Sequence, residues 1–331
     1  MVDVIALGEL LIDFVPTVSG VTLIEAPAFK KAPGGAPANV AAGLAKLGIR
    51  AGFMGKVGDD AFGRFLAQTL EQVGVDTSAL CFSAEARTAL AFVSLRTDGE
   101  REFMFYRHPS ADMLYTPDEV GTNAERIRNA KILHYGSISL ISEPSRSATL
   151  RAIEIARSAG LLLSYDPNLR LNLWPDAEAA RAGILLGWPL AHLIKVSEEE
   201  LAFLAGTDDP QAAVRKLWHP ALRLLVITLG KAGCRYATPQ FSGRVPGFEV
   251  KAVDTTGAGD GFVAGLLKGL VDHPQAEGDE AQLRAICRYA NAVGAITTTE
   301  RGAIPALPTA DQVDEFLQHG AATAEDTGIG H

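Results

Sequence analysis

The feature that most constrains the fold is an alternation of short apolar segments with helical segments from Lys131 onward. The apolar segments, each about the length of a strand, cover 132–135, 161–165, 193–196 and 224–228. Strands that alternate with helices form right-handed βαβ units, which build a mainly parallel sheet with helices on both faces. Such a sheet binds ligands at the carboxyl ends of its strands. We therefore expect a doubly wound α/β fold with a site at that edge.

The amino-terminal part of the chain extends this pattern and then departs from it. Strands are expected over 2–7 and 51–57, and a helix over 61–73. Two more strands, 88–96 and 101–107, flank an Asp-Gly turn at 97–100, which is typical of a hairpin. Together with residues near 18–30, this hairpin should form a small sheet outside the main alternation.

The expected organisation is one domain over 1–320 that carries the small sheet as a lid. The core covers about 1–13, 31–86 and 108–320, and the lid is inserted at about 14–30 and 87–107. Residues 321–331 are rich in Gly, Ala and Thr and should form a disordered tail.

Both faces of the predicted small sheet are apolar. Ala89, Ala91 and Val93 alternate with Leu90 and Phe92, so neither face is suited to water. One face should cover the substrate and the other should need a partner. This predicts a homodimer through residues around Leu90, Phe92 and Phe103.

Composition excludes several classes of partner. The chain has 331 residues, 47% of them hydrophobic, so it can bury a sizeable core. A net charge of −9 argues against binding to nucleic acid or to an anionic membrane. The three cysteines are far apart and lack metal-ligand spacing, which favours a reducing compartment. We expect a cytoplasmic protein with neither a targeting segment nor a membrane span.

The candidate reaction centre is the sequence Asp254-Thr255-Thr256-Gly257-Ala258-Gly259-Asp260, which precedes an apolar helix over 262–270. A glycine turn before a helix points unpaired N–H groups at an anion. Asp260 places a carboxylate beside those groups, which suits a base that takes a proton from a hydroxyl during phosphoryl transfer. A glycine turn with an N-cap aspartate and no catalytic role would fit the same residues.

Other nucleotide-binding motifs do not occur. The sequence has no G-x-x-x-x-G-K-[ST], no G-x-G-x-x-G after a strand, and no His-Arg-Asp with Asp-Phe-Gly. These absences disfavour P-loop enzymes, dinucleotide dehydrogenases and protein kinases. The charge of a phosphate would have to be met by the 257–260 turn, by Mg²⁺ and by a few cationic side chains.

Two glycine motifs carry a family resemblance. D-T-x-G-A-G-D resembles the carboxyl-terminal signature of the ribokinase-like (PfkB) sugar kinases, and residues 34–41 resemble their amino-terminal signature. The chain is closer still to plant-type fructokinases, from Gly8 to about Pro308. The matching stretches include 8–14, 103–107, 165–170 and 301–305. The resemblance implies a ribokinase-like fold and phosphorylation of D-fructose by ATP, giving fructose 6-phosphate.

The resemblance also implies roles for individual residues of this sequence. Asp260 would be the general base, beside an anion hole formed by Gly257, Ala258 and Gly259. The sugar would contact Asp13, Gly34, Gly35, Asn39, Phe105, Arg107, Arg170 and Asp260. ATP would contact Asn168, Lys195, Thr228, Gly230, Gly233, Gly257, Gly259 and Asn291. Glu198 would organise Mg²⁺ through water, while Asp254, Thr256 and Gly302 would hold K⁺.

The sequence departs from the family at three positions in or beside these motifs. Lys195 replaces an asparagine found in many relatives, which fits a direct contact with phosphate. Leu229 replaces a glutamate common in plant fructokinases, and Gly261 replaces the usual alanine. None of these changes removes a reacting group, although a glycine in the first turn of the helix should loosen it.

Two alternatives remain open. Arg107 and Arg170 would also suit a carboxylate, so the protein could be a 2-keto-3-deoxygluconate kinase or another PfkB sugar kinase. A non-catalytic regulatory protein on the same fold would be expected to have lost the base or the anion hole. Asp260 and the glycine turn are both present, which disfavours it.

Overall fold

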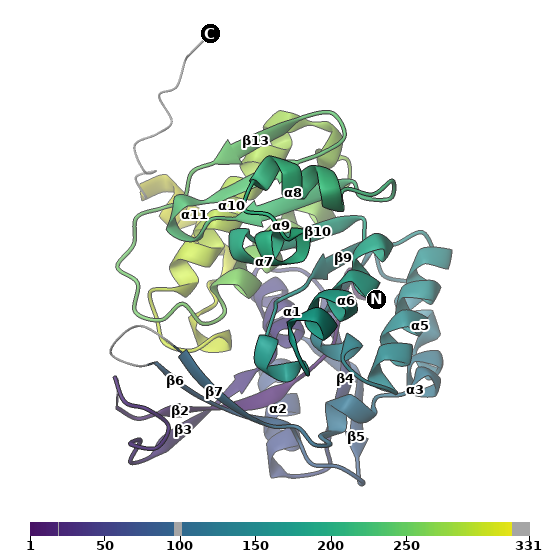
Figure 1. The fold of residues 1–331 in the computed structure, drawn as a ribbon, viewed down its shortest axis with the longest axis vertical. Coiled ribbons are helices and arrows are strands. Elements are labelled where there is room, and N and C mark those ends of the chain that lie inside the picture. Colours follow the sequence, from purple (N-terminus) through teal and green to yellow (C-terminus); the bar gives the residue numbers. More distant parts are fainter. Residues whose placement is uncertain (19, 96–100, 320–331) are drawn as a thin grey trace.

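The structure, a computed structural model, describes residues 1–18, 20–95 and 101–319. It contains one large sheet covered by helices and one small separate sheet (Figure 1). The turn predicted at 97–100 and the tail predicted at 321–331 lie outside the described residues.

The large sheet is mainly parallel, as the alternating pattern predicts. From one edge to the other its strands are β13 (Ser242–Val245), β12 (Cys234–Ala237), β11 (Leu224–Thr228), β10 (Leu193–Ser197), β9 (Leu162–Asp166), β8 (Ile132–Gly136), β1 (Val4–Leu7), β4 (Ala51–Gly58) and β5 (Asp76–Ser83). Only the pairs β11–β12 and β12–β13 are antiparallel among the described strands of this sheet. The strands are apolar on both sides because helices cover both faces.

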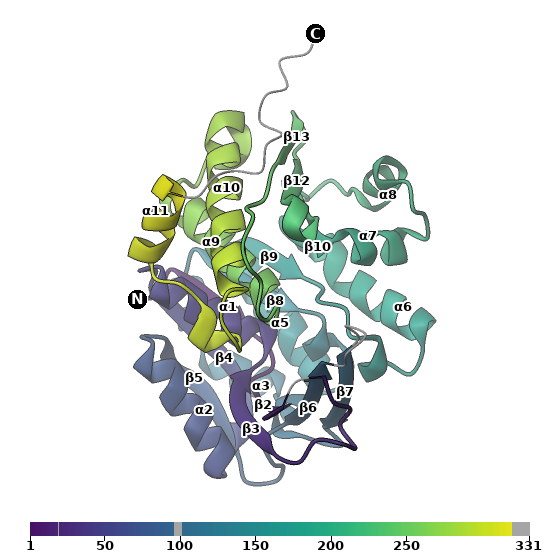
Figure 2. The ribbon, with the colours of Figure 1, turned by 90° about the vertical axis from the view of Figure 1, so that its left-hand side faces the viewer.

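Strand β1 shows how the two faces form. Val4 and Ala6 belong to one buried cluster, whereas Ile5 and Leu7 belong to the other. The two helical layers lie on opposite sides of the sheet (Figure 2). The first layer contains α1 (Ala36–Lys46), α2 (Ala61–Gln72), α9 (Ala258–Asp272), α10 (Glu280–Thr297) and α11 (Ala310–His319). The second contains α3 (Pro117–Thr122), α4 (Ala124–Arg128), α5 (Ser145–Ser158), α6 (Ala177–Gly187), α7 (Glu198–Ala205) and α8 (Pro210–Leu217). The doubly wound fold is confirmed.

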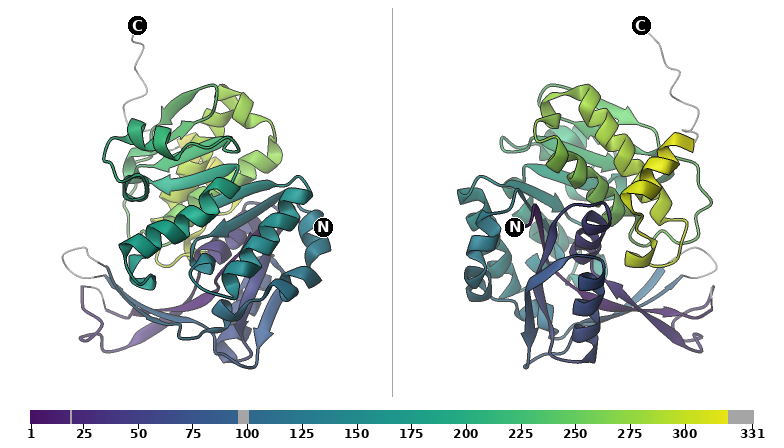
Figure 3. Two further views of the ribbon diagram at one scale, coloured as in Figure 1. Left: turned by 45° about the vertical axis from the view of Figure 1, so that its right-hand side comes forward. Right: turned by 180° about the vertical axis from the view of Figure 1, so that it is seen from behind.

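The small sheet projects from one end of the molecule (Figure 3). Its order is β3 (Phe29–Gly34), β2 (Leu11–Pro16), β6 (Leu90–Leu95) and β7 (Arg101–Tyr106). The strand expected near 18–30 is therefore displaced. It forms over Phe29–Gly34 because Lys30 to Gly34 pair with Leu11 to Val15 of β2. This register brings Gly34, a predicted sugar contact, to the end of a strand.

The two faces of the small sheet have different neighbours. On one face, Leu11, Ala89 and Ala91 form a small buried cluster with Phe105 packed against it. On the other face, Phe14 stacks on Phe92 with ring centroids 4.9 Å apart and meets Phe62 of α2 edge to face at 5.8 Å. Helix α2 thus covers part of the face that was expected to need a partner.

No helix in the described part of the chain is long and apolar enough to cross a lipid bilayer.

Candidate active site

The predicted base lies in the first turn of α9, where it meets the first turn of α1. Asn39 donates a hydrogen bond from Nδ2 to Oδ2 of Asp260 at 2.7 Å, although the two residues are 221 positions apart. Burial raises the pKa of Asp260 to about 6, while the bond from Asn39 opposes the shift. A carboxyl with this pKa is ionised above neutral pH and still has appreciable affinity for a proton.

The glycine turn before α9 is closed against a later part of the chain. Gly257 is the N-cap residue of α9 with φ of 78°, and a Cβ atom there would lie 2.7 Å from Cβ of Ala303. Asp254 accepts hydrogen bonds from the Thr256 N–H at 2.9 Å and from the Gly302 N–H at 3.0 Å. The turn therefore requires glycine at 257 for both conformation and space. The three residues predicted to hold K⁺ are brought together.

A lysine of α1 forms hydrogen bonds with the backbone that follows Gly302. Lys46 in the last turn of α1 donates from Nζ to the carbonyl oxygens of Ile304 at 2.9 Å, Pro305 at 3.2 Å and Leu307 at 2.7 Å. Helix α1 thus carries Asn39 near its start and holds the 304–307 backbone at its end.

Gly261 has a structural explanation. A Cβ atom at this position would lie 2.8 Å from Oγ1 of Thr297 and 3.2 Å from Cδ2 of Leu307. These side chains occupy the space that the alanine methyl group of other family members would take. The glycine therefore allows close packing of α9 on α10 instead of merely loosening the helix.

The predicted sugar contacts gather beside Asp260. A Cβ atom on Gly34 would overlap the carboxylate of Asp13, so the glycine lets that carboxylate lie against the backbone. Burial raises the pKa of Asp13 to about 7; the Arg170 guanidinium opposes this shift, and the Asp260 carboxylate adds to it. Asp13, Arg170 and Asp260 thus interact electrostatically within one site.

Arg107, a predicted sugar contact, is paired with a nearby carboxylate. Its guanidinium forms an ion pair with Asp112, and Asp112 also accepts a hydrogen bond from the Ser110 hydroxyl at 2.5 Å. Arg107 is 5% exposed. Phe105 packs against the cluster of Leu11, Ala89 and Ala91 on the face of the small sheet that carries Asp13.

Glu9 binds the start of α1, directly after the glycine pair Gly34 and Gly35. Its Oε1 accepts a hydrogen bond from the Ala36 N–H at 2.9 Å, at the start of α1, and its side chain is buried. Burial raises its pKa to about 7. The residue belongs to the matching stretch 8–14, but no pattern in the sequence pointed to this contact.

Lys195 in the middle of β10 and Asp166 at the end of β9 form a buried ion pair. Nζ of Lys195 lies 3.0 Å from Oδ2 of Asp166. The attraction of Asp166 and Glu200 outweighs burial and raises the pKa of Lys195. A Cβ atom on Gly259 would lie 3.2 Å from the same Nζ, so the ammonium group lies against the start of α9. Asp166 was missed by sequence reasoning, which noted only Asn168 and Arg170 after this strand.

Of the other predicted nucleotide contacts, three lie at or just after the end of β11 and one lies in α10. Thr228 ends β11, and Gly230 and Gly233 bound a short 3-10 turn between β11 and β12. Asn291 donates from Nδ2 to the carbonyl oxygens of Val245 at 3.3 Å and Pro246 at 3.0 Å. The amide of Asn291 therefore fixes the backbone that follows β13.

Glu198 opens α7, where Ser197 and Glu200 form a capping box. An acidic residue in this position is also stabilised by the helix dipole, with or without a metal. No group of three or more His, Cys, Asp or Glu side chains that could hold a metal ion occurs among the residues that the structure describes. Mg²⁺ that is bound mainly by water and phosphate needs no such group, since it commonly keeps several waters.

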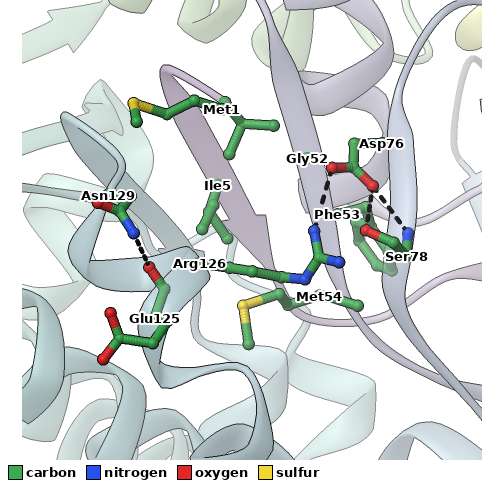
Figure 4. A pocket seen from close by; sticks show the side chains of 12 residues that line it. Met1, Ile5, Gly52, Phe53, Met54, Asp76, Ser78, Glu125, Arg126 and Asn129 are labelled. Atoms are coloured by element: carbon green, nitrogen blue, oxygen red, sulfur yellow. Dashed lines mark hydrogen bonds and ion pairs between the residues drawn. The ribbon is translucent and has the colours of Figure 1, made fainter.

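A separate pocket of about 220 Å³ lies at the opposite ends of the strands (Figure 4). Met1, Ile5, Phe53 and Met54 form its apolar part. Arg126 crosses it toward Asp76 with an ion pair of 3.4 Å. None of the predicted site residues lines this pocket.

Known proteins resemble this chain over nearly its whole length. The profile of the pfkB family carbohydrate kinases matches residues 1–310. Probable fructokinase-4 of Arabidopsis thaliana is 60% identical over 317 residues, which cover 95% of this chain and 96% of the relative. The fructokinase of Xylella fastidiosa with bound ATP has a TM-score of 0.88 at 35% identity, covering 96% of this chain and 98% of that one.

The fructokinase of Vibrio cholerae O395 has been solved with fructose, ADP and calcium. It has a TM-score of 0.85 at 38% identity and covers 96% of this chain and 99% of that chain. A double mutant of the same enzyme was solved with fructose, ADP and potassium. The chain described here belongs to the pfkB family of carbohydrate kinases, the family that its two glycine motifs resemble.

Proposed function

We propose that this carbohydrate kinase is a fructokinase that transfers the γ-phosphoryl group of ATP to O6 of D-fructose. The observation that carries the proposal is the position of Asp260, which is held by Asn39 directly behind the glycine turn. The names of the relatives support fructose as the acceptor, and the ATP and ADP in two related structures support the donor.

Asp260 takes the proton from the sugar hydroxyl as the new O–P bond forms. The bond between the γ-phosphorus and the bridging oxygen breaks, and ADP leaves with that oxygen. The N–H groups of Gly257, Ala258 and Gly259 stabilise the transferring phosphoryl group, since the first N–H groups of a helix have no partner within it. The Ala258 N–H would exchange its 3.3 Å hydrogen bond to the Thr255 carbonyl oxygen for one to the phosphate. Glu198 would hold Mg²⁺ through water, and the bound ion would neutralise charge on the phosphate oxygens.

Fructose lies between the small sheet and the start of α1 in this proposal. Asp13 accepts from two sugar hydroxyls, and Gly34 and Gly35 let the sugar approach the backbone. Oδ1 of Asn39 is buried and has no hydrogen-bond partner among the described residues, so it is free to accept from a third hydroxyl. Arg170 and Arg107 complete the polar side, and Phe105 closes the site with an apolar wall.

ATP lies across the carboxyl ends of β9, β10 and β11. Lys195 contacts the transferring phosphate, because its ammonium group already lies against Gly259. The other nucleotide contacts are Asn168, Thr228, Gly230, Gly233 and Asn291.

A panel of acceptors in a coupled ADP-release assay tests this function. We expect kcat/KM for fructose to exceed that for 2-keto-3-deoxygluconate by at least tenfold. The acid would lack one hydrogen-bond donor at Phe105, and a missing bond to a charged group costs about 1.5–3 kcal/mol. Phe105→Tyr should narrow the gap. A wild-type preference for the acid would overturn fructose as the substrate, and no turnover of any sugar would favour a regulatory protein.

Cations should control the rate. Asp254 accepts hydrogen bonds from the Thr256 N–H and hydroxyl and from the Gly302 N–H, so K⁺ would find the oxygen atoms of Asp254, Thr256 and the backbone near Gly302 close together. Bound K⁺ would steady the 254–257 turn without touching the sugar. We expect K⁺ to activate the enzyme relative to a large organic cation at equal ionic strength, and EDTA to abolish activity until Mg²⁺ is restored. Equal rates in both monovalent salts would contradict the K⁺ site.

We also propose a homodimer through the outer face of the small sheet. Phe92 forms an aromatic cluster with Phe14, Phe29 and Tyr106 there, and Tyr106 is 57% exposed. The side chain of Phe103 lies outside the described residues. Val93, which pairs with Phe103 in the register of β6 and β7, is next to Phe92 in the strand and therefore points to the opposite face. Light scattering at micromolar concentration should give the mass of a dimer. A monomer would refute this part of the proposal.

A further inference from the structure

Asp166 holds Lys195 through a contact that the fold imposes. Ile194 of β10 pairs with Tyr165 of β9, so the next residues of these two parallel strands, Lys195 in the middle of β10 and Asp166 at the end of β9, lie side by side. Asp166 is 3% exposed and Lys195 is 8% exposed. The second carboxylate oxygen of Asp166 accepts from the Asn168 N–H at 3.2 Å, which fixes its orientation.

Stability does not explain a buried ion pair in this position. The cost of removing two charges from water roughly cancels their attraction, so apolar residues of similar volume would stabilise the fold equally well. The pair lies instead where phosphate charge must be met. The Lys195 ammonium group lies 3.2 Å from where a Cβ atom of residue 259 would be. The charges of Asp166 and Lys195 also shift the pKa of Asp260, in opposite directions.

We propose that Asp166 is a positioning residue for phosphoryl transfer: its carboxylate holds the Lys195 ammonium against Gly259, where it meets the phosphate. The inference rests on the proposed function, in which Asp260 is the base. Asp166 itself touches neither the sugar nor the phosphate. Without it, Lys195 would keep its charge but lose the direction in which it points.

The charge of Asp166 has a second effect that can be measured. Asp166 raises the pKa of Asp260, whereas Lys195 and Arg170 lower it; Asp13 and Asn39 are the other polar groups that face it. Removal of the negative charge at 166 should therefore lower the pKa of Asp260. Because the base must be ionised, the acidic limb of the pH profile of kcat/KM should move to lower pH.

Asp166→Asn tests both effects, because asparagine keeps the shape and the acceptor for the Asn168 N–H. We expect the KM for ATP to rise about tenfold or more, as for loss of a bond to a charged group. The KM for fructose should stay within about twofold, and the acidic limb should shift as described. Calorimetry with ADP should show the same weakening without any turnover.

A double-mutant cycle with Lys195→Met shows whether Asp166 acts through the lysine. If it does, Asp166→Asn in the Lys195→Met background should cause no further loss of ADP affinity. Asp76→Asn is the matched control, since Asp76 forms an exposed ion pair with Arg126 far from the site, and its kinetics should match the wild type. Asp166→Glu keeps a negative charge at position 166 but places it one methylene group further along the side chain. The acidic limb of the kcat/KM profile should therefore stay at the wild-type pH, while ADP should still bind more weakly.

Three results would overturn the inference: unchanged ADP affinity in Asp166→Asn, additive losses in the cycle, or an unmoved pH limb. If Asp166→Asn does not fold, Asp166→Glu tests the inference instead, and wild-type ADP affinity in that variant would overturn the inference. Failure of the proposed function is separate. It would appear as turnover that survives Asp260→Asn, whereas ADP affinity depends on neither the base nor the sugar.

Discussion

Asp260→Asn should lower kcat by about 10²–10⁴-fold while the protein still binds fructose, because removal of a positioned general base has a cost of that size. Asparagine keeps an oxygen and a similar volume, so the start of α9 should retain its packing. It cannot take a proton from the sugar hydroxyl. The loss should therefore appear in kcat, measured as ADP release at saturating fructose and ATP.

Asp272→Asn provides the control for this experiment. Asp272 is the last residue of the same helix, where its carboxylate forms an exposed pair with Lys268 at 2.6 Å. We expect its turnover to equal that of the wild type. If Asp260→Asn folds, binds fructose and turns over at a near-normal rate, Asp260 is not the base.

Gly34→Ala should raise the KM for fructose by about 10²-fold or more. The backbone of Gly34 is in a conformation open to any residue, so the effect isolates the added methyl group. That group would overlap the Asp13 carboxylate and drive it from its place. Two hydrogen bonds between this carboxylate and sugar hydroxyls would be lost, each worth about 1.5–3 kcal/mol. Initial rates against fructose at saturating ATP measure the change.

Gly121→Ala is the matched control for this substitution. Gly121 lies in α3 with nothing within 4 Å of an added Cβ atom, so the same change there should leave the KM for fructose unaltered. The affinity for ADP should be normal in both variants, since neither glycine lies near the strands that hold the nucleotide in the proposed function. A KM for fructose within about threefold of wild type in Gly34→Ala would remove Asp13 from the sugar site.

The elements that local sequence determines were predicted well. The strands after Lys131 were found because apolar runs and helical periodicity depend on neighbouring residues alone. The start of α9 was found because three glycines over 257–261 permit a sharp turn, and an apolar pattern at helical spacing follows them directly. The candidate base required no knowledge of the fold, since it is part of the same motif.

What escaped prediction depends on residues that are distant in the chain. The limits of β2 and β3 follow from their mutual register, which no local pattern encodes. The pairing of Arg107 with Asp112 required the turn that brings them together. The contact between Asp166 and Lys195 depends on β9 and β10 being neighbours in the sheet, with a register that places the two residues side by side. The sequence alone left that strand order open.

Helix α1 has a consequence for how the two substrates influence each other. This eleven-residue helix bears Asn39, which holds Asp260, and Lys46, which grips the backbone beyond Gly302. In the proposed function, this helix therefore connects the sugar side of the site with the side that would hold the cation. Thermodynamic linkage makes such a connection reciprocal. If fructose shifts this helix and changes the affinity for nucleotide by some factor, nucleotide changes the affinity for fructose by the same factor.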